Sequence, residues 1–333
     1  MRVGTWRGGA KFSVDEVAPP APGPGQALVD VRAAGICGTD VHATQGLFPW
    51  APPMVMGHEY TGVVADVGRG VSKRLIGRAV ACEPSYGCGE CAECAEGRVS
   101  QCARCTRVGG FAEHVVLPVA NLHRLPRGLD PVTAAMTEPA ACCLAGLEQF
   151  AMPRGATVLV LGGGIMGLLT MVLAGRRGAK RLITSDPIAE RRAAAKRLGA
   201  AVTIDPTAEN LKARVAELTH GRGADVVCEA VGKPELVAEA LTLVRPTGVL
   251  QLVGVNPQGS RLPLDLWDVH YREIRIHGAF GRGRSFRRAL ALMPKLGVGS
   301  LVTARFPLAK IEDAFAHAAA GRGVKTIITP SGA

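Results

Sequence analysis

A short glycine-rich segment, Gly162–Gly167, constrains the fold of this chain more than any other feature. It follows an uncharged run, residues 158–161, that is typical of a buried parallel strand, and it precedes a helical stretch, residues 168–174. A strand, a G-x-G-x-x-G segment and a helix in this order form the usual context of dinucleotide binding, with the phosphates at the helix N-terminus. The segment therefore predicts cofactor contacts from Gly162, Gly164, Ile165, Met166 and Gly167.

A carboxylate follows the next predicted strand, residues 181–185. Asp186 lies 186 − 167 = 19 residues after Gly167. This spacing is close to the roughly 20 residues expected of an acid that accepts a hydrogen bond from the ribose 2′-hydroxyl. Because a carboxylate repels a 2′-phosphate, the sequence predicts NAD(H) rather than NADP(H).

The strand and helix pattern continues beyond this unit. Residues 224–232 are typical of a central strand and loop, residues 249–254 of a further strand and residues 273–280 of the last one, with helical stretches between them. This alternation predicts a doubly wound parallel sheet whose ligands bind at the carboxyl ends of the strands.

Size and charge limit the classes of function. The 333 residues suffice for two domains of roughly 150 residues each. The net charge is +11, but the arginines are scattered and aromatic residues make up only 4% of the chain, whereas a nucleic-acid-binding surface needs clustered basic residues. We expect no nucleic-acid partner, and the positive field can instead attract an anionic cofactor.

Targeting signals are not apparent in the sequence. Residues 1–6 lack the apolar core of a signal peptide. Residues 156–175 are uncharged and long enough to span a membrane, but four glycines within six residues interrupt them, and a nucleotide-binding unit explains the pattern better. Ten cysteines without a secretory signal favour metal ligands or reduced thiols over disulfides. We therefore expect a cytoplasmic protein with no membrane partner.

The first 140 residues have a different pattern. Residues 27–33 alternate as a half-buried strand, residues 60–68 form another strand that ends in glycine, and the proline-rich residues 19–25 form a rigid connector. Many short strands at close spacing predict a small, irregular β-barrel-like domain.

Two segments of this region contain metal-ligand residue types. Cys37 lies in the segment Gly35–His42, and His58 and Glu59 follow Gly57. Thiolate, imidazole and carboxylate are the ligands that zinc prefers in a site with an open position for substrate. Alone, Cys37 would be typical of a small buried residue and His58 of a structural one. Their occurrence together, upstream of a dinucleotide motif, favours a catalytic metal site.

A third segment has the spacing C-x₂-C-x₂-C-x₇-C, formed by Cys88, Cys91, Cys94 and Cys102. Four thiolates this close can surround one zinc ion and leave no open position. The segment has few apolar residues, so the metal would have to organise it. An iron–sulfur site, two disulfides or a redox switch are the alternatives, and Cys105 could compete as a ligand. Ordinary packing is expected of Cys82, Cys142, Cys143 and Cys228.

The order of these motifs resembles the zinc-dependent medium-chain alcohol dehydrogenase family over essentially the whole chain. The motifs are G-x-C-G-T-D-x-H, G-H-E, four spaced cysteines, G-G-F-A-E and G-x-G-x-x-G. Thr137–Pro139 is most similar to the polyol (sorbitol-type) and threonine dehydrogenase branch, because the classical liver-type enzymes have a cysteine ligand there.

The resemblance implies an α/β fold with two domains. Residues 1–140 and 286–333 would form a GroES-like irregular β-barrel that is the catalytic, zinc-binding domain. Residues 141–285 would form a doubly wound Rossmann domain that binds NAD(H). The resemblance also implies a homodimer or homotetramer.

The resemblance further implies roles for individual residues. Cys37, His58, Glu59 and Glu138 would bind the catalytic zinc, the two glutamates directly or through water, and Asp40 would orient His58. Cys88, Cys91, Cys94 and Cys102 would hold a second, structural zinc. Thr39 would hydrogen-bond the substrate hydroxyl, and His42 would pass its proton to solvent through the nicotinamide ribose. Arg191 would contact the adenosine ribose and Lys325 the pyrophosphate, although both are also typical of solvated positions.

The sequence departs from the family pattern at one place. Only six residues, Ala103 to Val108, separate Cys102 from the segment Gly109–Glu113. Relatives usually have a longer loop there, next to the substrate cleft. The shortened loop leaves both the substrate and the contacts between subunits open.

The predicted function is hydride transfer between NAD(H) and a secondary alcohol or ketone. Glu59 and Glu138 would moderate the acidity of the metal because they donate more charge than neutral ligands. This favours a polyol, a cyclitol or an amino alcohol, whose neighbouring group can add a second ligand to zinc. The alternative is a non-catalytic, NAD-binding zinc protein that acts as a redox sensor or regulator; Thr39 and His42 argue against it, because a sensor needs no proton relay.

Overall fold

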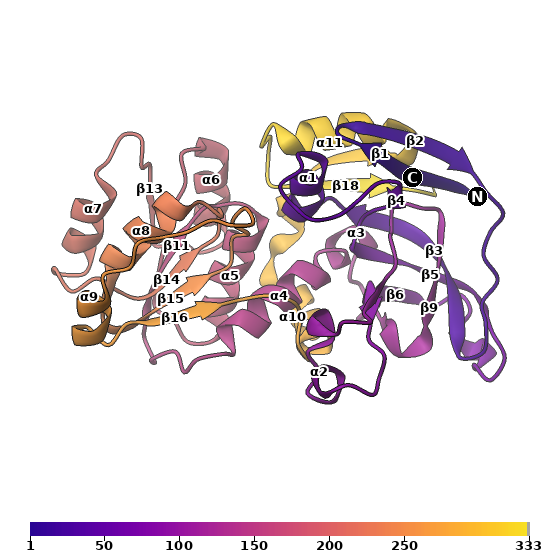
Figure 1. The fold of residues 1–333 in the computed structure, drawn as a ribbon, viewed down its shortest axis with the longest axis horizontal. Coiled ribbons are helices and arrows are strands. Elements are labelled where there is room, and N and C mark those ends of the chain that lie inside the picture. The colour runs from indigo at the N-terminus through magenta and orange to yellow at the C-terminus, as the bar shows by residue number, and fades with distance from the viewer. Residues whose placement is uncertain (332–333) are drawn as a thin grey trace. The chain divides into compact units, whose positions relative to one another are not determined.

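The chain forms two units in the computed structural model, which describes residues 1–331 (Figure 1). The first unit comprises Met1–Ala141 and the segment from Gly281 onwards, and the second comprises Cys142–Phe280. The sequence predicts the second junction at residue 286, which is 286 − 281 = 5 residues later than in the structure. Each unit has its own hydrophobic core.

A seven-stranded sheet dominates the first unit, with the strand order β10-β6-β5-β3-β18-β17 and with β9 also paired to β3. Its strands are β3 (Gln26–Gly35), β5 (Glu59–Val67), β6 (Ala79–Cys82), β9 (His114–Pro118), β10 (Leu122–Arg124), β17 (Val302–Pro307) and β18 (Lys325–Thr329). Strand β3 forms because Ala27, Val29 and Val31 alternate toward the core and are fully buried.

The C-terminal segment completes this sheet. Strand β18 pairs antiparallel with β3, so that Ile327 lies opposite Gly35 and Ile328 opposite Ala34. The yellow C-terminal strand therefore lies among the dark N-terminal strands in Figure 1. This pairing brings Lys325, the first residue of β18, to the end of β3 where the metal-ligand segments begin.

Smaller elements surround the main sheet of the first unit. Two small sheets consist of β1 (Arg2–Gly8), β2 (Lys11–Glu16) and β4 (Met54–Val55), and of β7 (Ser85–Tyr86) and β8 (Thr106–Arg107). The helices are α1 (Gly38–Thr44), α2 (Ala92–Ala95), α3 (Pro131–Ala134), α4 (Thr137–Leu147, which continues into the second unit), α10 (Phe286–Leu296) and α11 (Ile311–Ala319). Short 3₁₀ helices are η1 (Lys73–Leu75), η2 (Val99–Gln101), η3 (Val119–Asn121), η4 (Val298–Leu301) and η5 (Leu308–Lys310).

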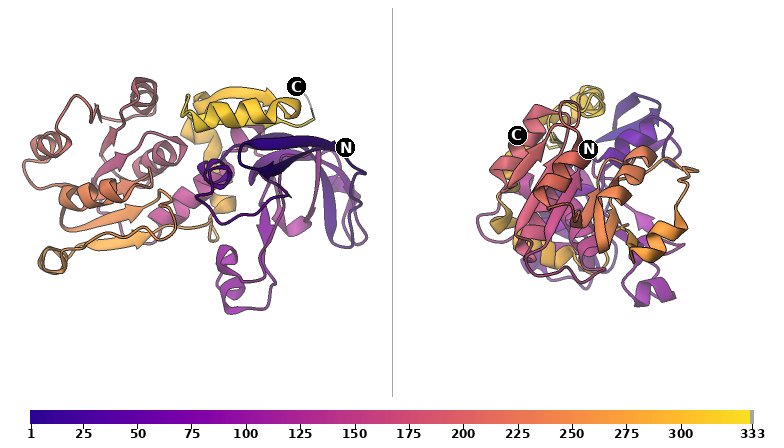
Figure 2. Two further views of the ribbon diagram at one scale, coloured as in Figure 1. Left: turned by 45° about the horizontal axis from the view of Figure 1, so that its top comes forward. Right: turned by 90° about the vertical axis from the view of Figure 1, so that its left-hand side faces the viewer.

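The second unit is a parallel sheet of six strands in the order β13-β12-β11-β14-β15-β16, with helices packed along it (Figure 2). The strands are β11 (Thr157–Leu161), β12 (Arg181–Ser185), β13 (Val202–Ile204), β14 (Ala224–Glu229), β15 (Val244–Leu252) and β16 (Arg275–Gly278). The helices are α5 (Ile165–Arg176), α6 (Ala189–Arg197), α7 (Leu211–Leu218), α8 (Pro234–Leu243) and α9 (Leu266–Tyr271). From β11 to β13 each new strand is added on one side of β11, and from β14 to β16 on the other side. A doubly wound sheet binds its ligand where this order reverses, which is here between β11 and β14.

The predicted fold class, an irregular β domain plus a doubly wound Rossmann domain, is confirmed. The uncharged stretch at residues 156–175 is divided between β11 and α5, as the glycines indicate. Within residues 1–331, none of the helices has both the length and the apolar character needed to cross a bilayer.

Candidate metal centres and dinucleotide site

The register of β3 and β5 brings the first set of metal-ligand residues together. Gly35, at the end of β3, pairs with Glu59, at the start of β5. Cys37 follows two residues after Gly35 and precedes α1, and His58 directly precedes Glu59. One ligand atom from each of Cys37, His58 and Glu59 lies within 4.8 Å of the other two. Two turns that are separate in sequence therefore converge on one point.

The carboxylate of Asp40 lies next to the His58 ring. The fully buried carboxylate of Asp40 places Oδ1 3.4 Å from His58 Nδ1, and its Oδ2 accepts a hydrogen bond of 2.9 Å from the backbone N–H of Cys37. Because Nδ1 faces this acid, Nε2 is the ring nitrogen left for a metal. Burial opposes the charged form of His58, but the negative charges of Asp40 and Cys37 outweigh it and raise the pKa of His58 well above its ordinary value.

Glu59 forms an ion pair with Lys325, and both side chains are completely buried. Lys325 Nζ also donates a hydrogen bond of 2.8 Å to the backbone carbonyl of Ile36. Glu59 Oε1 has no hydrogen-bond partner among the described residues. A buried carboxylate oxygen without a partner, beside a thiol and an imidazole, fits the ligand set of a zinc ion. The pyrophosphate contact predicted for Lys325 stays a prediction.

Glu138 lies outside this ligand group. Its Oε1 lies 3.4 Å from Arg282 Nη1, and both residues are buried. Arg282 also donates a hydrogen bond of 2.9 Å to Ser85 Oγ and lies 3.7 Å from Glu83 Oε2. The part predicted for Glu138 at the metal stays a prediction. No local pattern in the sequence predicts a role for Arg282 or Glu83, because their contacts join segments that are far apart in the chain.

Thr39 and His42 lie three residues apart on α1, so they occupy the same side of this helix. Both are half-buried. Burial lowers the pKa of His42 below its ordinary value, since the charged imidazole loses solvation. The aromatic side chain of Trp50 meets the His58 ring edge-on, with 6.0 Å between ring centroids. Trp50 in turn packs on Phe48.

The four spaced cysteines form a second group, in which the Sγ atoms of Cys88, Cys91, Cys94 and Cys102 lie within 4.8 Å of one another. The Cys88–Cys94 and Cys88–Cys102 sulfur distances are 4.0 and 3.7 Å. Zinc–sulfur bonds of about 2.3 Å in a tetrahedron place the sulfurs about 3.8 Å apart, whereas a disulfide requires about 2.05 Å. All ten cysteines are free thiols, which contradicts the disulfide alternative.

Backbone N–H groups lower the pKa of the Cys88 and Cys102 thiols. Hydrogen bonds from the backbone of Glu90 and Cys91 lower the pKa of the Cys88 thiol to about 6. At Cys94 the backbone N–H of Gly89 acts in the same direction, but burial and the neighbouring sulfurs outweigh it and raise the pKa of this thiol to about 12. Cys105 is not a member of the group, and its Sγ instead lies 3.9 Å from the Thr106 carbonyl. The arrangement therefore fits a closed, structural zinc site.

The glycine segment forms the turn between β11 and α5. Gly162 has a φ of 99°, and a Cβ atom on Gly167 would lie 1.8 Å from the Gly162 carbonyl oxygen, so neither position tolerates a side chain. Gly164 precedes the first residues of α5, Ile165 and Met166. The segment thus has the glycine-dependent geometry that the dinucleotide motif requires.

Asp186 lies beside the glycine segment. Its Oδ2 accepts a hydrogen bond of 2.7 Å from the backbone N–H of Gly163, and its Oδ1 accepts one of 2.8 Å from Ile188. Arg191 places Nη1 3.8 Å from the same Oδ2. The predicted ribose acceptor, the predicted ribose-contacting arginine and the glycine loop are therefore neighbours.

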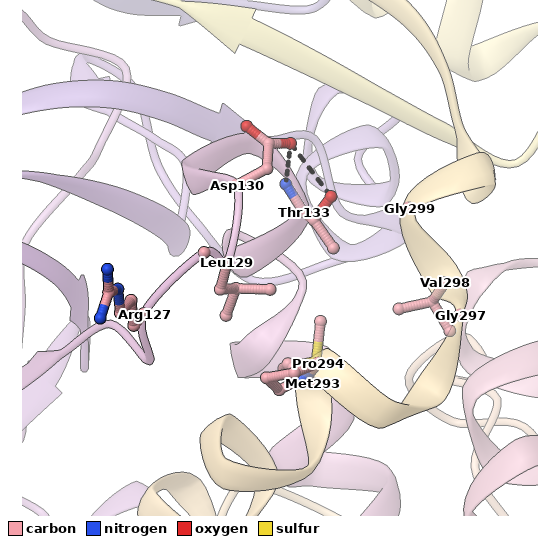
Figure 3. Close-up of a pocket in the computed structure, with 10 residues that line it drawn as sticks. Arg127, Leu129, Asp130, Thr133, Met293, Pro294, Gly297, Val298 and Gly299 are labelled. Atoms are coloured by element: carbon pink, nitrogen blue, oxygen red, sulfur yellow. Dashed lines mark hydrogen bonds between the residues drawn. The ribbon is translucent and has the colours of Figure 1, made fainter.

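A surface pocket of the first unit lies elsewhere (Figure 3). It lies between residues 127–133 and 293–299 and includes none of the predicted site residues. Its one acid, Asp130, already accepts hydrogen bonds from the backbone N–H and the hydroxyl of Thr133 at 3.1 and 3.0 Å, which caps α3. We assign it no function.

Comparison with known proteins gives the family. Residues 23–127 match the alcohol dehydrogenase GroES-like domain, and residues 166–295 match the zinc-binding dehydrogenase family. Sorbitol dehydrogenase of Halalkalibacterium halodurans is 32% identical, with 98% of each chain covered. L-threonine 3-dehydrogenase of Pyrococcus horikoshii is 33% identical, with 94% of this chain and 93% of that protein covered.

A solved structure is similar over the whole chain. It is described as a zinc-binding dehydrogenase from Sinorhizobium meliloti 1021 bound to NADP, with 36% identity, a TM-score of 0.93 and 99% of both chains covered. The metal-ligand groups, the glycine segment and these relatives agree on an oxidoreductase that acts on a small-molecule alcohol with zinc and a nicotinamide dinucleotide. The chain belongs to the zinc-dependent medium-chain alcohol dehydrogenase family, in its sorbitol and threonine dehydrogenase branch.

Proposed function

We propose that this enzyme transfers hydride between NAD(H) and a secondary alcohol or its ketone, where the carbon next to the carbinol bears a hydroxyl or amino group. Polyols, cyclitols and amino alcohols are the substrate classes. The convergence of Cys37, His58 and the carboxylate of Glu59 on one point carries this proposal.

Cys37 and His58 would hold the catalytic metal, and Glu59 would bind it directly or lie next to it. Zinc, when bound, supplies a positive charge that stabilises an alkoxide relative to its alcohol. Asp40 keeps the His58 ring oriented through Nδ1. Glu138 is proposed as a further carboxylate of the site, reached directly or through water, and Arg282 holds it in the structure.

Thr39 and His42 would move the substrate proton. A threonine hydroxyl can accept a hydrogen bond from the substrate and donate one onward. Since burial lowers the pKa of His42, this imidazole is neutral at pH 7 and able to accept a proton. Their positions on one side of α1 support a relay from the substrate toward solvent.

The charge of the ligand set supports this substrate class. A carboxylate ligand leaves the metal less acidic than neutral ligands do, so each substrate atom binds more weakly, and a substrate with two donor atoms would compensate for this by chelation. The relatives named for sorbitol and L-threonine point the same way, because both molecules have a heteroatom next to a secondary alcohol carbon. Trp50, beside His58, offers an apolar edge for the carbon face of such a molecule.

NAD(H) would bind at the glycine segment and act as the hydride carrier. Asp186 favours NAD(H), because its buried carboxylate repels a 2′-phosphate. Arg191 offsets part of that charge, and the Sinorhizobium protein was crystallised with NADP. We therefore expect a preference for NAD(H) that still allows some use of NADP(H). Arg191 would be a further contact to the ribose, and Lys325 would lie near the pyrophosphate.

The quaternary structure is proposed to be a homodimer or a tetramer built from dimers. Among residues 1–331, strand β16 pairs only with β15, so it is an open edge of the parallel sheet. Near this edge in sequence, Trp267 and Tyr271 stack on each other and are 67% and 66% exposed. An open edge can pair with the same edge of a second copy across a two-fold axis. Size-exclusion chromatography with light scattering tests this; a monomer at micromolar concentration contradicts it.

A substrate panel tests the proposed function. NADH formation is followed at fixed NAD with vicinal diols, polyols, amino alcohols and primary monoalcohols of equal carbon number. We expect the vicinal classes to have the higher kcat/KM, because each adds a second donor atom. A clear preference for primary monoalcohols would contradict the substrate class, and binding of NAD(H) without turnover of any alcohol would favour the sensor alternative.

A further inference from the structure

Glu229 is a buried acid that the proposed chemistry does not use. It is the last residue of β14 and is completely buried. Its Oε1 accepts hydrogen bonds of 2.8 Å from the backbone N–H groups of both Val231 and Gly232. Burial raises the pKa of Glu229, and these N–H groups oppose that effect. The side chain thus fixes the turn Ala230–Gly232 without an ion pair among residues 1–331.

One side of this turn packs against the glycine segment. The backbone N–H of Ala230 donates a hydrogen bond of 2.9 Å to Leu161, the residue before Gly162. A Cβ atom on Gly162 would lie 2.7 Å from Val231 Cγ2 and 3.3 Å from the Ala230 carbonyl oxygen. Since side-chain carbon atoms do not approach this closely, the turn and the glycine segment fill each other's space. A shift of the turn would remove the contacts that keep Gly162, the first glycine of the motif, in its position.

The other side of the turn is held by the end of β15. The backbone N–H groups of Val253 and Gly254 donate hydrogen bonds of 2.8 and 2.9 Å to the Glu229 carbonyl oxygen. A Cβ atom on Gly232 would lie 2.3 Å from the Val255 carbonyl oxygen. The turn is therefore wedged between the carboxyl ends of β11 and β15, at the place where the strand order reverses and a doubly wound sheet binds its ligand.

We propose that Glu229 is a positioning residue for the dinucleotide: it orders the turn Ala230–Gly232, which in turn fixes the glycine segment against the cofactor. This inference rests on the proposed binding of NAD(H) at that segment. Glu229 is assigned no contact with the metal ligands or the reacting atoms. Its removal should weaken cofactor binding and leave the alcohol site intact.

The test uses the zinc-loaded full chain and three variants. Glu229→Ala removes the acceptor of the Val231 and Gly232 N–H groups, of which that of Gly232 is buried. Glu229→Gln keeps an oxygen acceptor of the same length without the charge. Glu217→Ala, an exposed acid on α7 of the same unit, is the matched control for loss of a negative charge. The readouts are the Kd for NADH by fluorescence, the KM values for cofactor and alcohol, and the thermal midpoint.

We expect Glu229→Ala to raise the Kd for NADH about tenfold, as the loss of one buried and one partly buried hydrogen bond implies, while the KM for alcohol stays within about twofold. Glu229→Gln should restore most of the affinity, and Glu217→Ala should match the wild type. If Glu229→Ala does not fold, Glu229→Gln and Glu229→Asp replace it in the test. Wild-type affinity for NADH in Glu229→Gln, together with weaker NADH binding in Glu229→Asp, supports the role. The shorter side chain of aspartate cannot reach both N–H groups.

Two results would overturn the inference. Wild-type Kd for NADH in a folded Glu229→Ala variant, or in Glu229→Asp, means that the turn does not position the cofactor. Equal weakening of cofactor and alcohol binding means that Glu229 is merely structural. If the wild-type enzyme itself binds neither NADH nor NADPH, the proposed function fails, and this inference fails with it.

Discussion

Lys325 and Glu59 form a fully buried ion pair, although 325 − 59 = 266 residues separate them in the chain. Strand β18 delivers Lys325 to the end of β3, and the register of β5 delivers Glu59 to the same point. The positive charge of Lys325 therefore offsets one carboxylate of the candidate metal centre before any metal binds. The C-terminal segment thus contributes to a site whose proposed ligands lie in the N-terminal part of the chain.

Replacement of Lys325 by Met should destabilise the metal-free protein. The variant leaves the buried Glu59 carboxylate without a counter-charge, which typically costs about 3–5 kcal/mol. Zinc should recover more stability in Lys325→Met than in the wild type, because the metal replaces the missing positive charge. Urea unfolding with and without zinc measures both effects.

Lys310→Met is the control for this experiment, because Lys310 is exposed and should tolerate the change. Equal unfolding midpoints for Lys325→Met and the wild type, without metal, would contradict the buried ion pair.

Replacement of Cys37 by Ser should abolish turnover and remove one zinc ion, while the fold persists. Cys37 lies at the start of α1 and is one of the three proposed ligands, so its loss removes the thiolate but few packing contacts. Zinc content by mass spectrometry, together with NADH formation, measures the effect. Cys105→Ser is the control, since Cys105 lies outside both ligand groups. An undiminished rate in Cys37→Ser with excess zinc would exclude Cys37 from the site.

Replacement of Cys94 by Ser should loosen the cysteine loop without direct loss of the catalytic ligands. Within the described residues, the loop between β7 and β8 has only the short helices α2 and η2, so four metal bonds would be its main constraint. We expect faster proteolysis within residues 88–105 and a lower thermal midpoint, with the zinc at Cys37 retained. If the wild-type protein keeps its protease resistance after its metal is removed by a chelator, no metal organises this loop.

Replacement of Asp186 by Ala should shift cofactor preference toward NADP(H). The variant removes the charge that repels a 2′-phosphate and keeps the positive charge of Arg191 next to that position. We expect the ratio of kcat/KM for NAD to that for NADP to fall at least about tenfold, which corresponds to about 1.4 kcal/mol. An unchanged ratio would mean that Asp186 does not discriminate between the ribose of NAD and that of NADP.

Local patterns in the sequence predicted much of this structure. The glycine segment and Asp186 could be recognised because strand, turn and acid follow one another within a single βα unit. The cysteine group could be recognised because all of its members lie within one loop. Both sets depend on spacing, which the sequence displays directly.

Contacts between distant segments could not be predicted in the same way. Lys325 meets Glu59 only because β18 returns to β3, and Arg282 meets Glu138 only because the chain re-enters the first unit at Gly281. Neither basic residue has a local pattern that distinguishes it from a solvated one. The sequence likewise predicts Glu229 only as part of a strand, because its proposed role depends on the shape of the turn that follows.

Anomalous diffraction at the zinc edge shows whether Cys37 and His58 share one zinc ion. We expect a peak within the cysteine loop and a second peak about 2.3 Å from Cys37 Sγ and about 2.0–2.1 Å from His58 Nε2. A zinc-replete crystal with a peak in the cysteine loop alone, and none between Cys37 and His58, would contradict the account.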